Sequence, residues 1–166
     1  MAKRSAKTRT SSADRASVRY IESSALVAAL LEREADALKS VRTRGRTVTS
    51  ALTIAEAARA ILRARAAARL TADQEQAAVR ALRRFERRCF LVAVTDAVLA
   101  RVRRPFPVEP VRTLDALHLA TIELLGEPPA LVTVTTRDVR IQDNARALGY
   151  RVESRPRFEA RPASRE

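Results

Sequence analysis

The sequence of 166 residues contains one cysteine, no tryptophan and only 4% aromatic residues. A single cysteine, Cys89, excludes an internal disulfide and a cysteine metal cluster, and we expect a reduced, partly buried thiol there. The low aromatic content argues against a surface of rings that stack on single-stranded bases. No apolar run approaches the length of about 20 residues that a membrane span needs, and the amino-terminal segment lacks the apolar centre of a secretory signal. These absences predict a cytoplasmic protein that does not bind a membrane.

Positive charge is what the sequence has in excess, with a formal net charge of +13. Such a charge attracts polyanions and favours encounters with RNA, DNA or an acidic protein segment. Only Lys3, Lys7 and Lys39 are lysines among the 32 basic residues, and a GC-rich coding genome would produce the same arginine bias without selection for binding. The charge therefore narrows the class of partner but does not indicate a chemistry.

One domain over residues 18–153 is predicted from the length and from the 46% hydrophobic content, which together can supply a core. Residues 1–17 are polar, basic and without periodicity, so we interpret them as a disordered arm. Residues 154–166 are rich in arginine and interrupted by proline, and are interpreted as a flexible tail.

Short apolar runs alternate with amphipathic segments along the domain, which is typical of a parallel α/β sheet. Strands are predicted at residues 18–22, 46–50, 90–94, 130–136 and 150–154. Helices are predicted at residues 24–41, 54–70, 96–104, 112–126 and 138–149, and another begins at Thr71 with a capping box to Gln74.

The segment RTLDALHLATIELLG, Arg112 to Gly126, is predicted to form an amphipathic helix that Gly126 ends. Near its beginning, Asp115 and the only histidine, His118, are three residues apart and so lie near one face. Its apolar face is expected to consist of residues at three- and four-residue steps, namely Leu114, Leu117, Thr121, Leu124 and Leu125.

Four acids fall at junctions between predicted strands and helices: Glu22, Glu56, Asp115 and Asp138. In an open parallel sheet the carboxyl ends of the strands and the amino ends of the following helices share one edge, where ligands bind. Four acids there would repel one another strongly unless a cation lay among them. Oxygen ligands, without cysteine and with a single histidine, favour Mg²⁺ or Mn²⁺ over zinc.

Each acid also has an ordinary explanation at the start of a helix, where a carboxylate satisfies free amide groups. Thr53 and Glu56 fit a capping box, and Thr113 could cap the helix that contains Asp115. Either Thr135 or Thr136 could act in the same way before Asp138.

Three further residues have structural interpretations. Asp96 is expected to cap a short helix, and Asp143 is expected to be an exposed helix acid. His118 is expected to line the core or to hydrogen-bond a neighbouring group rather than to bind a metal. The residue pattern by itself therefore predicts only an acidic pocket.

Four segments occur in an order that is typical of one known family: YIESSALVAALLE, TSALTIAEAARAI, RTLDALHLATIEL and LVTVTTRDVRIQDNARALGYRV. By these segments the chain from Tyr20 to Val152 resembles the PIN-domain ribonucleases, particularly the VapC-like toxins of bacterial toxin–antitoxin pairs. The resemblance implies a three-layer α/β fold with a central, mostly parallel sheet flanked by helices. It also implies a metal-dependent endoribonuclease that acts as a toxin.

By the same resemblance, Glu22, Glu56, Asp115 and Asp138 are the catalytic acids. Glu22, Asp115 and Asp138 would hold one or two Mg²⁺ or Mn²⁺ ions, and Glu56 would complete the site or orient water. Ser24 matches a small hydroxyl residue that hydrogen-bonds within the site.

One residue departs from the family's pattern, because the first acid is usually aspartate and here it is Glu22. The extra methylene moves the carboxylate outward by roughly 1.5 Å, one C–C bond, and Mg²⁺ tolerates little departure from octahedral geometry. The alternative hypothesis is therefore a catalytically weak PIN fold that binds RNA or a protein. A DNA-associated module is a third possibility, although the sequence shows no helix-turn-helix signature.

The resemblance implies an RNA substrate and a cognate antitoxin as partners, and a homodimer is predicted as well. Outside the pocket, flanking phosphates could contact arginines that could equally be ordinary solvated residues: Arg59, Arg63, Arg112 and Arg137. Between Ala55 and Cys89, a clamp for the antitoxin or for a second copy, or simply the core, could be formed by Ile61, Leu62, Leu70, Val79, Leu82 and Phe85.

Overall fold

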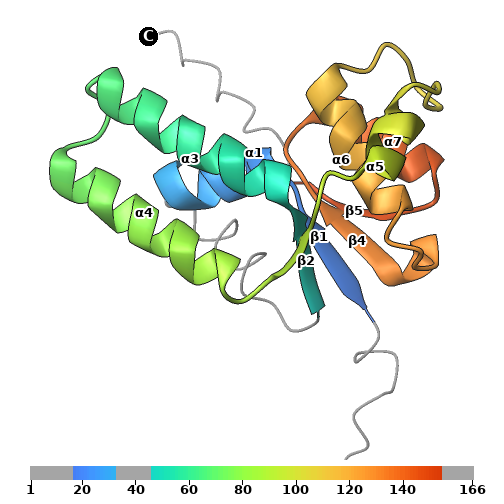
Figure 1. Cartoon of the computed structure of the whole chain (residues 1–166), viewed down its shortest axis with the longest axis horizontal. Coiled ribbons are helices and arrows are strands. Elements are labelled where there is room, and N and C mark those ends of the chain that lie inside the picture. The colour runs from blue at the N-terminus through green and yellow to red at the C-terminus, as the bar shows by residue number, and fades with distance from the viewer. Residues whose placement is uncertain (1–16, 33–45, 155–166) are drawn as a thin grey trace, which may run out of the picture.

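The computed structural model describes residues 17–32 and 46–154 (Figure 1). The predicted amino-terminal arm and carboxyl-terminal tail lie outside the described residues, apart from Ser17 and Ser154. Residues 33–41 of the first predicted helix also lie outside them.

Five parallel strands form the centre of the fold. The predicted strands are all confirmed, and β2 and β4 consist largely of valine and threonine, whose β-branched side chains favour extended backbone. The order across the sheet is β3-β2-β1-β4-β5, and every neighbouring pair is parallel. The strands are β1 (Val18–Ile21), β2 (Arg46–Ser50), β3 (Phe90–Val92), β4 (Val132–Thr135) and β5 (Arg151–Glu153).

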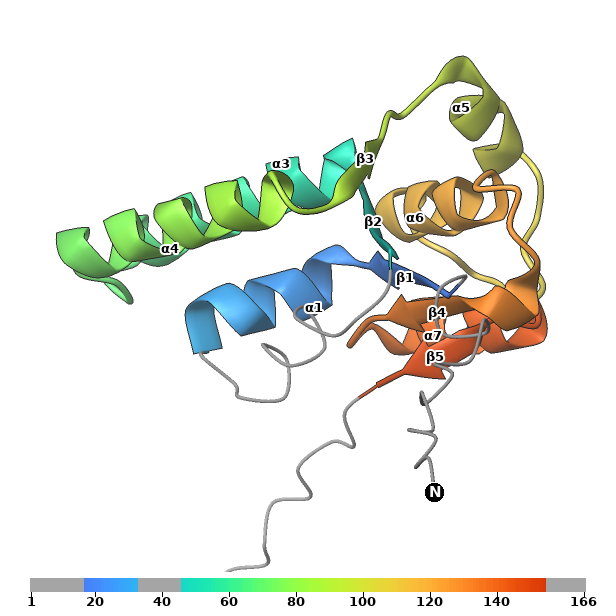
Figure 2. The same cartoon turned by 90° about the horizontal axis from the view of Figure 1, so that it is seen from below.

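Helices connect successive strands, as parallel pairing requires, and flank the sheet (Figure 2). The predicted α/β class is therefore confirmed. No helix in the described part of the chain is long and apolar enough to cross a membrane. The helices are α1 (Ser23–Val27) with its π-helical continuation η2 (Ala28–Glu32), α3 (Ala51–Ala66), α4 (Ala72–Glu86), α5 (Asp96–Val102), α6 (Thr113–Glu123), the 3₁₀ turn η3 (Pro129–Leu131) and α7 (Val139–Ala147).

Two helices are capped by residues other than those predicted. Ser50 caps α3, because its side chain accepts a hydrogen bond from the amide of Leu52. Thr53 therefore lies inside the helix, and the predicted capping box of Thr53 and Glu56 is wrong. Thr95 rather than Asp96 caps α5, and its hydroxyl accepts from the amide of Val98.

The remaining helix starts include one confirmed prediction. Thr71 and Gln74 form the predicted capping box at the start of α4. At the start of α6, in contrast, no side chain makes a capping hydrogen bond, so the cap predicted for Thr113 is wrong. Asp138 itself caps α7, in place of the predicted Thr135 or Thr136.

The larger hydrophobic core joins one face of the sheet to α5, α6 and α7. In α6 the buried residues include Ala116, Leu119 and Ala120, whereas Leu114 and Leu124 are each 48% exposed. The predicted helix is confirmed. Of its predicted apolar face, Thr121 is buried and Leu117 and Leu125 pack against the core, so the prediction is wrong only for Leu114 and Leu124. Since α6 carries apolar residues around most of its circumference, their spacing does not single out the side that faces the sheet.

A second core cluster lies among α1, α3 and α4. Figure 1 shows α3 and α4 side by side as a hairpin, with α1 against them. Ile61, Leu82 and Phe85, which were candidates for a partner clamp, are buried in this cluster, and Cys89 packs against it as a partly buried free thiol. Burial raises the pKa of Cys89 to about 11. Leu62 remains 48% exposed.

Substitution of two neighbouring residues of α3 tests the assignment to the core. Ile61 is 1% exposed, so Ile61→Ala removes buried methyl groups and should lower the free energy of unfolding by about 2–5 kcal/mol. Leu62→Ala, the matched control, should change it by less than about 0.5 kcal/mol. Equal effects of the two substitutions in urea unfolding would contradict the assignment.

Candidate active site

The strand order creates a topological switch point between β1 and β4, because the chain continues from β1 to β2 on one side and from β4 to β5 on the other. Ligands bind at such points, outside the carboxyl ends of the strands. Glu22 directly follows β1, and Asp138 lies three residues after the end of β4. Glu56, from α3, and Asp115, from the first turn of α6, come to the same edge.

Glu22 is 3% exposed, and its carboxylate bends back over the amino end of α1. Both of its oxygens accept from the amide of Ser24 at 3.0 Å, and Oε1 also accepts from Ser23 Oγ at 2.5 Å. Oε2 accepts from Thr136 Oγ1 at 2.7 Å and from Ser24 Oγ. Four donors therefore occupy the roughly four acceptor positions of this carboxylate. The side chain of Glu22 is one methylene longer than that of aspartate, and it is accommodated because it turns back toward α1.

Hydroxyl groups connect the start of α1 to the turn between β4 and α7. Ser24 Oγ lies 3.3 Å from Thr136 Oγ1 and accepts from the amide of Arg137 at 2.8 Å. Thr136 Oγ1 accepts in turn from the amide of Asp138 at 3.1 Å. The hydrogen-bonding position predicted for Ser24 is thus present, and Thr136, which the sequence suggested only as a helix cap, belongs to the same network.

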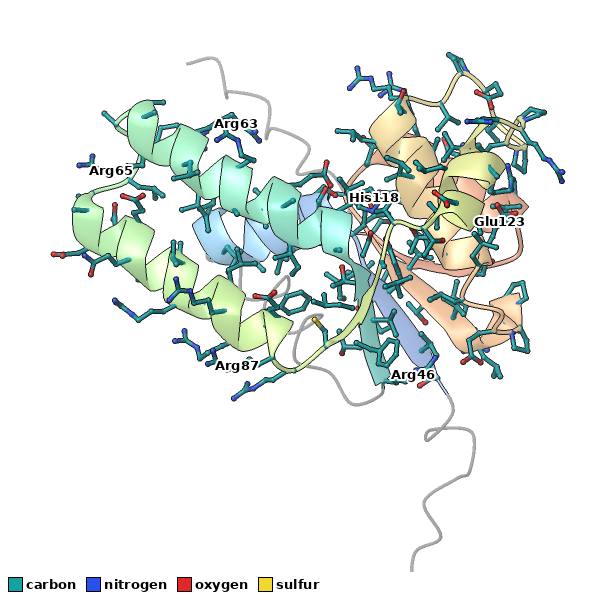
Figure 3. The ribbon with its side chains drawn as sticks, in the orientation of Figure 1. Arg46, Arg63, Arg65, Arg87, His118 and Glu123 are labelled. Atoms are coloured by element: carbon teal, nitrogen blue, oxygen red, sulfur yellow. The ribbon has the colours of Figure 1, made fainter. Side chains whose placement is uncertain are left out.

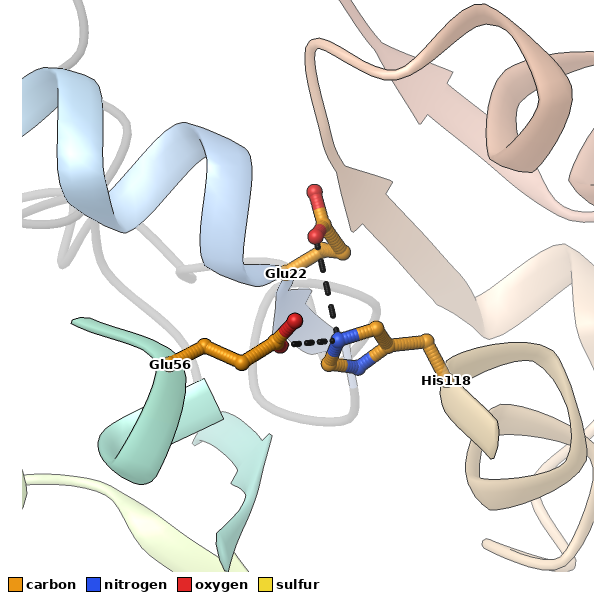
Figure 4. Close-up of side chains that lie close together, drawn as sticks. All are labelled: Glu22, Glu56 and His118. Atoms are coloured by element: carbon orange, nitrogen blue, oxygen red, sulfur yellow. Dashed lines mark hydrogen bonds and ion pairs between the residues drawn. The ribbon is translucent and has the colours of Figure 1, made fainter. Parts of the chain in front are cut away.

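The side chain of His118, from α6, is buried at 1% exposure and faces α3 (Figure 3). Its Nε2 is 2.8 Å from Glu56 Oε2 and 3.8 Å from Glu22 Oε1, and these three side chains point toward one another (Figure 4). Its Nδ1 is 2.9 Å from the hydroxyl of Tyr20, which is fully buried. The expected hydrogen bond from His118 to a neighbouring group is therefore present, with two partners.

The same contacts shift two pKa values. Burial tends to raise the pKa of Glu56, but the hydrogen bond and the charge interaction with His118 outweigh it and lower that pKa overall. Burial, followed by the negative charge of Glu22, raises the pKa of Tyr20 far above its usual value. At neutral pH, Glu56 is therefore ionised and the phenol of Tyr20 keeps its hydrogen.

The surroundings of Asp115 would favour a positive charge beside its carboxylate. Its Oδ2 is buried and has no hydrogen-bond partner among the described residues. Burial, and then the negative charges of Asp138 and Glu22, raise the pKa of Asp115, although Arg112 opposes the shift. Asp138 Oδ1 accepts a hydrogen bond from the amide of Arg140 at 2.8 Å. These three carboxylates thus lie close enough to interact electrostatically.

A divalent cation fits this arrangement. An unpartnered buried carboxylate oxygen is costly, and a cation among the acids would satisfy it and reduce their repulsion. Oxygen donors suit Mg²⁺ and Mn²⁺. Glu22, Glu56 and His118 also each offer one potential ligand atom, and these atoms lie within 4.8 Å of one another.

All four arginines that were predicted to hold phosphates are exposed: Arg59, Arg63, Arg112 and Arg137. The positive charge of Arg63 contributes to the lowered pKa of Glu56, and that of Arg112 acts on Asp115. Two of the four therefore influence the acidic site. A role for any of them in binding phosphate stays a prediction.

Residues 19–147 match the model of the PIN domain, and the chain belongs to this family, as its resemblance indicated. It is 40% identical over 135 residues to ribonuclease VapC46 of Mycobacterium tuberculosis, over 80% of this chain and 94% of that protein. It is 36% identical over 137 residues to ribonuclease VapC35 of the same organism, over 80% of this chain and 93% of that protein.

Solved structures of VapBC proteins share the fold. VapBC2 from Rickettsia felis, bound to a DNA fragment from its promoter, gives a TM-score of 0.59 at 12% identity, over 84% of this chain and 99% of that chain. VapBC-1 from nontypeable Haemophilus influenzae gives a TM-score of 0.53 at 13% identity, over 82% of this chain and 97% of that chain. The predicted fold family is confirmed.

The unfavourable energy of the Asp115 charge can be measured without any substrate. Burial, and then the charges of Asp138 and Glu22, raise the pKa of Asp115, so its charge disfavours the folded state above that pKa, and Asp115→Asn should raise the melting temperature in EDTA at pH 7. The rise should be about 2–4 °C for each kcal/mol of burial cost and repulsion that the substitution removes. Excess Mg²⁺ should then stabilise the unsubstituted protein more than the variant.

Asp143→Asn is the control, because Asp143 is an exposed acid on α7 that pairs with the exposed Arg146. It should leave both melting temperatures within about 1 °C, as expected for a surface pair. A lower melting temperature for Asp115→Asn in EDTA would show that the carboxylate is not repelled.

Proposed function

We propose that this protein is a metal-dependent endoribonuclease that hydrolyses RNA phosphodiester bonds and acts as the toxin of a toxin–antitoxin pair. The observation that carries the proposal is the buried, unpartnered oxygen of Asp115 beside Asp138 and Glu22, at the switch point of the sheet. The similarity to two proteins named as ribonucleases supports the same activity. A cytoplasmic location and a homodimer remain predictions.

Asp115, Asp138 and Glu22 are the residues that would hold Mg²⁺ or Mn²⁺. Asp115 contributes the uncommitted Oδ2, whereas Asp138 and Glu22 also keep the helices α7 and α1 capped. When bound, the ion would activate a water and offset the negative charge of the scissile phosphate. Ser24 and Thr136 hold the Glu22 carboxylate in place through their hydroxyl groups.

Glu56 has a different role from the other three acids. It is kept ionised and is held by His118 through Oε2. We assign to it the orientation of the attacking water. The exposed side chains of Arg59, Arg63, Arg112 and Arg137 would contact flanking phosphates.

A catalytically weak PIN fold that binds RNA or a protein is the second candidate, and one observation favours it. The Glu22 carboxylate already accepts from four donors, so a bound ion must compete with at least one of them. Against this, the carboxylate is directed toward the same site as Asp115, with which it interacts electrostatically.

Cleavage of single-stranded RNA in Mg²⁺ or Mn²⁺ tests the proposed activity. We expect cleavage to stop in EDTA and to fall in Asp115→Asn and Asp138→Asn by more than the roughly 10- to 100-fold that loss of an outer partner of a metal costs. Asp143→Asn should cleave at the normal rate. Cleavage that persists in EDTA or in Asp115→Asn would reject the site, whereas metal binding without cleavage of any RNA tested would favour the second candidate.

The proposed toxin role has a separate test in cells. Expression of the unsubstituted chain should arrest growth, and co-expression of the small protein encoded beside it should relieve the arrest. Asp115→Asn should allow growth by itself, yet it should still co-purify with that small protein, because the substitution changes one side chain of the acidic site and leaves the hairpin of α3 and α4 unchanged. Growth arrest by Asp115→Asn equal to that of the unsubstituted chain would contradict a nuclease toxin.

A further inference from the structure

We propose that His118 is a positioning residue that donates its Nε2 hydrogen to Glu56 and is not a ligand of the metal. The proposal rests on the proposed function, in that it concerns the metal site assigned there. The question arises because His118 Nε2 lies within 4.8 Å of a carboxylate oxygen on both Glu22 and Glu56. Three such atoms could hold a cation together. Whether Nε2 can act as a ligand depends on whether it carries a hydrogen.

The contact with Glu56 determines which atom carries that hydrogen. Glu56 Oε2 lies 2.8 Å from His118 Nε2, at hydrogen-bond distance. An ionised carboxylate can only accept, so the hydrogen between the two atoms must belong to Nε2. A ring nitrogen that bears a hydrogen has no lone pair for a metal. Nε2 therefore cannot ligate a metal as long as it donates its hydrogen to Glu56.

Tyr20 fixes the other side of the ring. Its hydroxyl lies 2.9 Å from His118 Nδ1, and both side chains are buried, at 0% and 1% exposure. A phenol is protonated at neutral pH and can donate its hydrogen to Nδ1. Tyr20, His118 and Glu56 therefore form one chain of hydrogen bonds, in which His118 Nε2 donates to Glu56.

The chain of hydrogen bonds ties together the elements that carry the acids. Tyr20 is in β1, two residues before Glu22, and His118 is in α6, three residues after Asp115. Glu56 belongs to α3, which packs in the other core cluster. The hydrogen bond from His118 to Glu56 thus spans the two clusters and sets the position of one acid relative to the others. The single histidine of the sequence acquires a specific role in this way.

Nitrogen NMR of the ring gives a direct test, because His118 is the only histidine and its signals need no assignment. In ¹⁵N-labelled protein we expect His118 Nε2 to carry a hydrogen both before and after addition of Mg²⁺. A ring with its only hydrogen on Nδ1, or loss of the Nε2 hydrogen when Mg²⁺ is added, would overturn the proposal. This measurement does not depend on RNA cleavage, so it can succeed where the proposed function fails.

Variants test whether the chain of hydrogen bonds positions the site. Removal of an outer partner of a metal site weakens metal binding about 10- to 100-fold, and we expect a loss of this size for Mn²⁺ binding in His118→Leu, measured by calorimetry. His118→Gln, whose side-chain amide can donate from the same Nε2 position, should recover much of the affinity. Equal losses in the two variants would contradict a donor role.

Tyr20→Phe separates positioning from ligation, because it removes only the hydroxyl that holds His118 Nδ1. We expect it to weaken Mn²⁺ binding measurably and to change the ¹⁵N signals of the His118 ring. Tyr150→Phe is the matched control, since Tyr150 is the other tyrosine and is also buried, at 8% exposure, whereas the hydroxyl that contacts His118 Nδ1 is that of Tyr20. If Tyr20→Phe keeps both the affinity and the ring signals of the unsubstituted protein, the proposal is overturned.

Discussion

Repulsion between carboxylates is the constraint on which the structure of this site depends. A parallel sheet brings the ends of its strands and the starts of its helices to one edge, and Glu22 and Asp138 follow the two strands that flank the switch point. Burial, and then the negative charges of Asp138 and Glu22, raise the pKa of Asp115, and its Oδ2 is buried with no partner among the described residues. A cation is the simplest group that relieves this repulsion.

The protein compensates for part of the repulsion with its own hydrogen-bond donors. Serine and threonine hydroxyls and a helix amide hold Glu22, whereas His118 holds Glu56. Each acid that is satisfied in this way is also fixed in position. Asp115 Oδ2 has no such donor among the described residues, so it is the oxygen at which a cation would bind.

Much of the fold follows from the sequence, because the alternation of short apolar runs with helical periodicity depends on local residue spacing. The starts of helices were harder to predict, since neighbouring residues such as Thr95 and Asp96 can both cap and only the backbone path selects one. The buried side of α6 was predicted only in part, because apolar residues surround most of the helix: Thr121 is buried, but Leu114 and Leu124 are exposed. The link from Tyr20 to Glu56 through His118 requires three elements to pack together. Its only sequence signals were the short spacings from Tyr20 to Glu22 and from Asp115 to His118.

Anomalous diffraction from crystals soaked in Mn²⁺ tests the central claim most directly, since it locates the ion independently of any activity. The repulsion among the acids predicts a manganese peak in contact with Asp115 Oδ2 and with a carboxylate oxygen of Asp138. His118 should stay hydrogen-bonded to Glu56 and outside the coordination sphere. A fully soaked crystal with no peak beside Asp115, or with its peak on His118 instead, would contradict the claim that these carboxylates converge to bind a cation.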